Sequence, residues 1–84
     1  MPDTLKVSVI TPERVVFEGD AEQVVAPAWD GEVGVLRGHA PMMALLGEGE
    51  LRVDTKGGTQ SFRVRAGFLQ VAEDTVTVLT ESAG

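Results

Sequence analysis

The amino-acid sequence predicts an all-β fold: a flattened antiparallel β-sandwich of about nine to ten short strands, in a single domain covering residues 1–84. Three observations support this prediction. Apolar and polar residues alternate with a period of two along most of the chain, as they do in strands with one buried face. Turn-forming residues, mainly glycine, proline and aspartate, separate the alternating runs. No glycine-free window keeps the 3.6-residue period of a helix for more than a few residues.

The predicted strands follow one another closely along the chain. In residues 5–11, leucine and valine alternate with lysine and serine, which places the apolar side chains on one face. The same alternation in residues 14–18 predicts that Val15 and Phe17 share a buried face. The remaining strand candidates are residues 23–26, 32–36, 42–46, 50–55, 60–66, 68–72 and 75–80. Valine and threonine are abundant in them, which suits pleated and half-buried surfaces.

One hairpin can be assigned a register. If residues 56–57 form a two-residue turn, Leu51 lies opposite Phe62 on the inner face. The same register sets Glu50 against Arg63 on the outer face, where opposite charges suit solvent. A slip by one residue would expose the whole apolar set, so we expect the register to be firmly specified.

The segment of residues 42–46, Met-Met-Ala-Leu-Leu, lacks this alternation. Each of its positions is apolar, so neither face is obviously the solvent face. Two interpretations stay open: the segment lies under a loop, or it forms an exposed apolar patch that a partner covers. Its two methionines slightly favour an adaptable contact surface.

Composition limits the classes of function. The net charge of −6, from thirteen acidic and seven basic residues, repels phosphate backbones, so we expect no nucleic-acid partner. No run approaches 18 apolar residues and no leader opens the sequence, so we expect neither membrane insertion nor export. The absence of cysteine excludes disulfides and thiolate metal sites.

The stretch of residues 27–42 is the most unusual part of the chain. It contains three glycines, two prolines, the single tryptophan Trp29 and the single histidine His39. Glycine and proline restrict or extend the backbone angles in ways that specify one shape. We therefore interpret this stretch as a loop whose shape is used, and as the place to look for function.

The chemistry of this stretch does not favour catalysis. The sequence neighbours of His39 supply neither a nucleophile nor an orienting group, and the glycines lack the lysine and the helix of a phosphate-binding loop. The acidic residues lack the order of a calcium loop. We therefore predict no catalytic residue, no cofactor and no metal. Trp29 could anchor a glycan, a small ligand or a protein, or cap one end of the sandwich.

Three motifs resemble the amino-terminal β-sandwich domain of the epsilon subunit of F-type ATP synthases. Residues 9–19, VITPERVVFEG, resemble the family's first hairpin, and residues 66–71 with 76–83 resemble its last. Residues 31–42, GEVGVLRGHAPM, match the specific signature G-E-x-G-[IV]-L-P-G-H-A-P-L. The resemblance covers essentially the whole chain.

The resemblance implies a non-catalytic rotor subunit in the central stalk of a proton-translocating ATP synthase. Such a subunit links the gamma subunit to the c-subunit ring, and lies peripherally at the cytoplasmic face of the bacterial inner membrane. The residues implied to face the ring are Asp30, Gly31 and Glu32. Those implied to face gamma are His39, Ala40, Pro41, Met42 and Ala44. The alternatives are a free-standing β-sandwich module that binds a small ligand or glycan through Trp29, and a small hydrolase organised around His39.

The sequence departs from the family pattern at two positions and in its extent. Arg37 replaces a usual proline, and Trp29 stands where the family commonly has a small or polar residue. Family members usually continue into a two-helix carboxy-terminal domain. We transfer none of the inhibitory or ATP-binding properties of that domain to these 84 residues.

Overall fold

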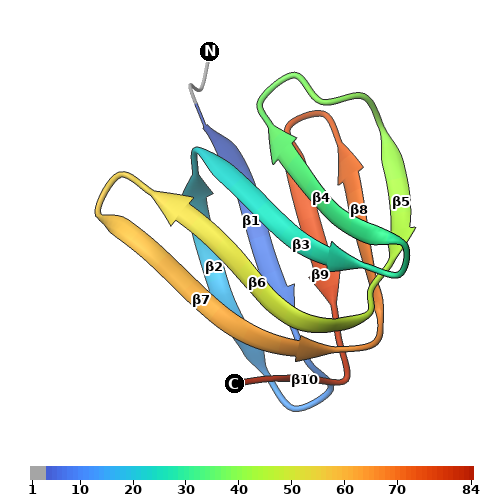
Figure 1. Ribbon diagram of the computed structural model, residues 1–84. Helices are drawn as coiled ribbons and strands as arrows, with labels where there is room; N and C mark the ends of the chain where they lie inside the picture. Colours follow the sequence, from blue (N-terminus) through green and yellow to red (C-terminus); the bar gives the residue numbers. More distant parts are fainter. Residues whose placement is uncertain (1–3) are drawn as a thin grey trace.

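The computed structural model describes residues 4–84 and contains ten strands in two five-stranded sheets that face each other (Figure 1). The strands are β1 (Leu5–Ile10), β2 (Val15–Ala21), β3 (Gln23–Ala28), β4 (Gly31–Leu36), β5 (Met42–Leu45), β6 (Glu48–Thr55), β7 (Gly58–Arg65), β8 (Phe68–Ala72), β9 (Thr75–Leu79) and β10 (Ser82–Ala83). No helix occurs in this part of the chain, so none is present there to cross a membrane.

The strand order is β2-β1-β9-β8-β5 in the first sheet, called sheet A, and β10-β7-β6-β3-β4 in the second, called sheet B. The predicted β-sandwich is confirmed, with one exception to its antiparallel pairing. Strands β1 and β9 pair in parallel at the centre of sheet A. A period of two identifies a strand but carries no information about its direction, so the sequence did not predict this pair.

The hydrophobic core lies between the two sheets and is built from alternate residues of each strand. In β1, the side chains of Leu5, Val7 and Val9 are buried, whereas Lys6 points to solvent. At one end of the sandwich, the rings of Phe17 and Phe62 face each other across the two sheets, with their centroids 6.1 Å apart. The buried hydrophobic residues are Leu5, Val7, Val9, Ala21, Val24, Ala26, Val35, Leu46, Leu51, Val53, Val64, Leu69, Val71, Val76 and Val78.

The β6–β7 hairpin has the register predicted from its turn. Leu51 lies opposite Phe62, and Glu50 lies opposite Arg63. Leu51 is fully buried and Glu50 is exposed, so the two faces of the hairpin are those that the charge pattern indicated.

The prediction that Val15 and Phe17 share a buried face is wrong. Between β1 and β2 the register shifts, so that Phe17 pairs with Val9 and Val15 pairs with Ile10. One additional residue therefore separates the two pairs on β2, which turns Val15 to the outer face, where it is 51% exposed. Phe17 remains half-buried against the core.

The stretch of residues 27–42 is not one loop. It contains the end of β3, a turn at residues 29–30, all of β4 and a loop at residues 37–41. In Figure 1, β4 leads from the turn at its lower right to the loop at the top of the sandwich. The glycines at both ends of β4 explain the misinterpretation, because Gly31 and Gly38 have φ angles of 134° and 84°, where side chains are unfavourable.

A third glycine, Gly67, allows two chain segments to touch. Its φ angle is 107°, and a Cβ atom there would collide with the backbone of Leu79 and Thr80. The hydroxyl of Thr80 is buried beside it and donates to the carbonyl oxygen of Ala66 at 2.8 Å. The β7–β8 connection is thus held directly against the end of β9.

Candidate functional site

The loop residues implied to face gamma lie at the opposite end of the sandwich from the residues implied to face the ring. Asp30 and Glu32 lie in and just after the β3–β4 turn, whereas His39 lies in the β4–β5 loop. The six residues of β4 separate Asp30 from the β4–β5 loop, which corresponds to about 15–20 Å at roughly 3.3 Å per residue. The loop with His39 therefore shares no pocket with the two carboxylates, whereas Met42 and Ala44 on β5 line one groove together with Asp30.

At the β3–β4 turn, the two carboxylates point in different directions. Asp30 is exposed in the turn, next to Trp29, whose side chain is 80% exposed. Glu32 is exposed on β4 opposite Pro27, on the outer face of sheet B, because the next residue, Val33, packs toward the core. Both carboxylates are available to a partner, but from neighbouring faces.

In the β4–β5 loop, hydrogen bonds to the backbone set the position of His39. Its amide donates to the carbonyl oxygen of Leu36 at 3.1 Å, and its ring Nδ1 lies 2.8 Å from the carbonyl oxygen of Ala40. The preceding amide, that of Gly38, donates to the Asp74 carboxylate at 2.7 Å. This ring bonds to its own loop, which does not resemble a catalytic base aligned on a nucleophile. Nowhere in residues 4–84 do three His, Asp or Glu side chains lie close enough to hold a metal ion.

Strand β5 settles the question that its sequence left open. Met42 and Ala44 are half-buried, and Met42 packs against the core. Met43 and Leu45 point outward and are 64% and 66% exposed. The apolar segment is therefore an exposed patch along one face, and the side chains that form its exposed face are Met43 and Leu45.

This patch belongs to a continuous row of apolar side chains across all five strands of sheet A. Leu45 pairs with Phe68, and Phe68 pairs with Leu79. Leu79 pairs with Ile10, and Ile10 pairs with Val15. Since paired residues share a face of the sheet, the five side chains lie in one line on the outer face.

We call this row, together with Met43 and Trp29 at its β5 end, the apolar band. Five of the six large exposed hydrophobic residues among those that the structure describes belong to it, the exception being Leu36 on β4. Trp29 joins the band because its amide donates to the carbonyl oxygen of Leu45 at 2.8 Å. Within the row, Ile10 and Phe68 are half-buried and the other members are exposed. Isolated exposed apolar residues are ordinary, whereas a contiguous apolar patch is typical of an interaction surface.

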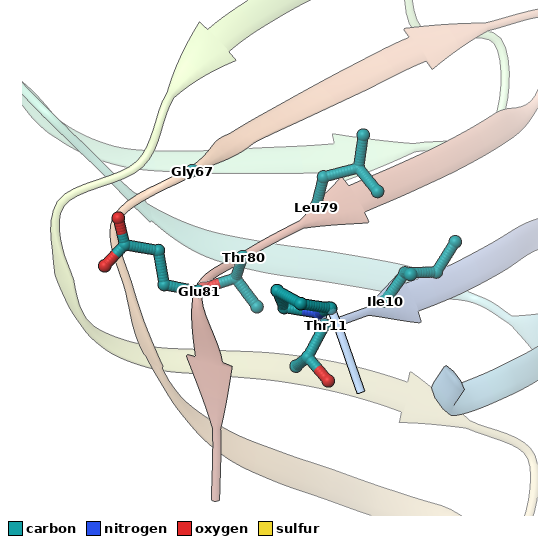
Figure 2. Close-up of a pocket in the computed structure, with 7 residues that line it drawn as sticks. Ile10, Thr11, Gly67, Leu79, Thr80 and Glu81 are labelled. Carbon is teal, nitrogen blue, oxygen red and sulfur yellow. The ribbon is translucent and has the colours of Figure 1, made fainter. Parts of the chain in front are cut away.

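Two hollows lie along the apolar band. The first, of about 340 Å³, is lined by Ile10, Pro12 and Leu79, with Gly67 and Glu81 at its margin. Figure 2 shows Ile10 and Leu79 on neighbouring strands on one side of this hollow and the Glu81 carboxylate on the other. The second is a groove of about 380 Å³ between β4 and β5, which we call the Trp29 groove. The residues that line it are Trp29, Asp30, Val33, Met42, Met43, Ala44 and Leu45.

Residues 42–46 and Trp29 were singled out from the sequence, but the rest of the apolar band was missed. Its members come from five strands and one turn, and four of them, Ile10, Val15, Phe68 and Leu79, were expected to be ordinary strand residues. The signal that reveals them is the pairing register, which a single sequence provides only for a tight hairpin. Asp74, which holds the β4–β5 loop from 36 residues away, was missed for the same reason.

Comparison with known proteins identifies the family. Residues 4–84 match the family of the β-sandwich domain of the ATP synthase delta/epsilon chain. The chain is 48% identical over 80 residues to the ATP synthase epsilon chain of Anoxybacillus flavithermus and 46% identical over 83 residues to that of Solibacter usitatus. These matches cover 95% and 99% of this chain, but 60% and 62% of the two relatives. The chain thus spans about three fifths of their length.

The fold is also found in solved structures of mitochondrial ATP synthases. A chain in the Euglena gracilis structure of OSCP, F1 and the c-ring aligns with a TM-score of 0.92 at 23% identity, covering all of this chain and 54% of that one. A chain in the central stalk and c-ring structure from Tetrahymena thermophila aligns with a TM-score of 0.81 at 15% identity, covering 95% and 65%. At these identities the similarity concerns the fold. Together with the sequence relatives, it establishes that this chain belongs to the family of ATP synthase delta/epsilon β-sandwich domains.

Proposed function

We propose that the protein is a non-catalytic subunit of the central stalk of a proton-translocating F-type ATP synthase, in which it links the gamma subunit to the c-subunit ring. The apolar band on sheet A is the observation that carries this proposal. A sandwich of this size has no need, for its own stability, to leave four large apolar side chains exposed on the outer face of sheet A and Trp29 exposed beside them. A protein partner that covers the band accounts for them.

The band is the proposed contact for the gamma subunit. The side chains that such a partner meets on β5 are Met43 and Leu45, while Met42 and Ala44 support them from the core side. The loop of His39, Ala40 and Pro41 lies at the start of the same strand. It would meet gamma at the end of the sandwich opposite to Trp29.

The β3–β4 turn is the proposed contact for the c-subunit ring. Asp30 and Glu32 are exposed, and Gly31 between them holds the turn in a positive-φ conformation. Two exposed carboxylates at one end of an acidic domain attract basic side chains and accelerate their association. Contact with a ring in the membrane would hold this subunit at the membrane surface without inserting it. We therefore place the subunit peripherally, at the cytoplasmic face of the bacterial inner membrane.

Family membership favours this role over the alternatives of a free-standing glycan-binding module and a small hydrolase. The chemistry of the complex would then take place on other subunits. The contribution of this domain would be to transmit torque through its two contact surfaces.

Co-purification with a tagged gamma subunit from the same organism tests the proposal. The wild-type chain is expected to co-purify, Leu45→Ser is expected to bind weakly, and Leu36→Ser serves as the matched control. Leu36 is 57% exposed but lies off the band, so its replacement should leave binding intact. If the wild-type chain fails to co-purify when both subunits are natively expressed, the proposed role is wrong.

A further inference from the structure

We propose that the Trp29 groove is a subsite for one long basic side chain, an arginine or a lysine, of the gamma subunit. This inference rests on the proposed function, and adds to it the chemistry of one anchoring contact. It is carried by the shape of the groove, by its single charge and by its continuity with the apolar band.

The groove lies between two sheet edges. Strand β4 pairs only with β3, and β5 pairs only with β8, so each strand leaves one edge open. Val33 on β4 and Met42 on β5 form the inner wall, and the turn that carries Trp29 closes one end. A volume of about 380 Å³ has room for a single large side chain, and it lies near the lower end of the roughly 300–1,000 Å³ of ordinary ligand pockets.

The walls suit an alkyl chain and the end suits a cation. Met43, Leu45 and the indole of Trp29 present apolar surface, along which the methylene groups of lysine or arginine can lie. The indole face also attracts a cation placed over it. These properties do not distinguish a basic side chain from a purely apolar one without a further observation.

That observation is Asp30. Asp30 is the one charged residue that lines the groove. Among residues 4–84, no lysine or arginine lines the groove or forms an ion pair with Asp30. A carboxylate at the end of an apolar channel, without a cation of its own chain, is complementary to a side chain with an apolar stem and a positive head.

The groove is assigned to the gamma side, which moves Asp30 from the proposed ring contact to gamma and leaves Gly31 and Glu32 to the ring. It shares Trp29, Met43 and Leu45 with the apolar band, so a partner that covers the band reaches the groove without a gap. Glu32, in contrast, points away onto the outer face of sheet B. The occupant is therefore assigned to gamma, and a contribution from the ring becomes an outcome of the test.

The test is a titration of the folded chain with purified gamma subunit, at low and at high salt. Trp29→Ala is expected to weaken binding by about tenfold at both salt concentrations. Asp30→Asn is expected to weaken it by about threefold at low salt, and by much less at 0.5 M salt, where the Debye length falls to about 4 Å. Asp30→Lys should weaken binding more than Asp30→Asn, and Trp29→Phe should restore part of the affinity.

Glu50→Gln is the matched control. It removes an exposed carboxylate from the outer face of sheet B, so affinity for gamma should stay unchanged. Because Trp29 and Asp30 are both exposed in a turn, the variants should keep the wild-type melting temperature. If Trp29→Ala does not fold, Trp29→Phe and Asp30→Lys still provide the test.

The outcomes separate this inference from the function on which it rests. If the wild-type chain does not bind gamma, the proposed function fails. If the wild-type chain binds gamma and both Trp29→Ala and Asp30→Lys bind equally well, the subsite is wrong and the proposed function stands. If these two variants lose affinity only for a complex that contains the c-subunit ring, the assignment of the occupant to gamma is overturned.

Discussion

Replacing Asp74 with glycine is expected to release the β4–β5 loop while leaving the rest of the sandwich folded. The Asp74 carboxylate accepts a hydrogen bond from the Gly38 amide at 2.7 Å, across 36 residues of sequence. This length lies in the range of about 2.7–2.9 Å for hydrogen bonds with one ionised group. Asp74 itself lies in the β8–β9 turn with a φ angle of 59°. Glycine adopts that angle without steric cost, so the substitution removes the carboxylate and keeps the turn.

The size of the effect follows from the geometry. A hydrogen bond to a charged group contributes about 1.5–3 kcal/mol, and solvent screening at this exposed site reduces it to about 1 kcal/mol. Losing about 1 kcal/mol of local stability should accelerate hydrogen exchange of the Gly38 amide about fivefold. Asp74→Asn keeps an oxygen acceptor without the charge, and should accelerate exchange only about twofold.

The assay is amide hydrogen exchange followed by NMR, with an internal control. The Lys6 amide donates to the backbone carbonyl oxygen of Asp74 at 2.9 Å, and so reports on the turn itself. Lys6 should keep its protection in both variants. Unchanged exchange at Gly38 in Asp74→Gly, with Lys6 still protected, would show that the carboxylate does not hold the loop and would refute the reasoning. Where the loop contributes to gamma binding, Asp74→Gly should also weaken that binding.

Three further predictions concern the packing. Gly67→Ala forces a side chain into the backbone of the neighbouring strand at a positive φ angle, so it should destabilise the fold by more than about 3 kcal/mol in urea unfolding. Gly57→Ala should not destabilise the fold in this way, because a Cβ atom there would meet only the Thr55 hydroxyl oxygen, at 3.9 Å. Met42→Ala should cost about 1–2 kcal/mol because the side chain packs against the core, and Met43→Ala less than about 0.5 kcal/mol because it is exposed; equal melting temperatures would contradict this division. Thr80→Val removes a buried hydroxyl that bonds to several backbone groups, and should cost about 1–3 kcal/mol by calorimetry.

Local parts of the fold were predictable from the sequence. The β6–β7 hairpin was assigned correctly because its turn has two residues and its apolar side chains can face inward in only one register. The bulge that turns Val15 outward was not predictable, because one additional residue in β2 leaves no mark in the alternation. The strand between Asp30 and His39 was among those predicted, as residues 32–36, but interpreting residues 27–42 as one loop obscured that it separates the two residues.

The candidate site was predicted less well than the fold, for a physical reason. The signature residues are contiguous in the chain, so a single sequence draws attention to them. The apolar band is contiguous only in space, since it joins Val15 to Leu45 through three strands between them. A surface that results from strand pairing becomes visible only when the pairing is known.

The parallel pair at the centre of sheet A has a consequence for how the protein folds. Strand β1 begins at Leu5, but its partner β9 begins at Thr75, so about 70 residues must be closed into a loop before they pair. In the β6–β7 and β8–β9 hairpins, the two paired strands are close in sequence, so these hairpins can form early. Because distant contacts slow folding, joining β1 to β9 should be the late step that completes the core. During synthesis, β1 would leave the ribosome long before its central neighbour exists, with only β2 to protect one of its edges.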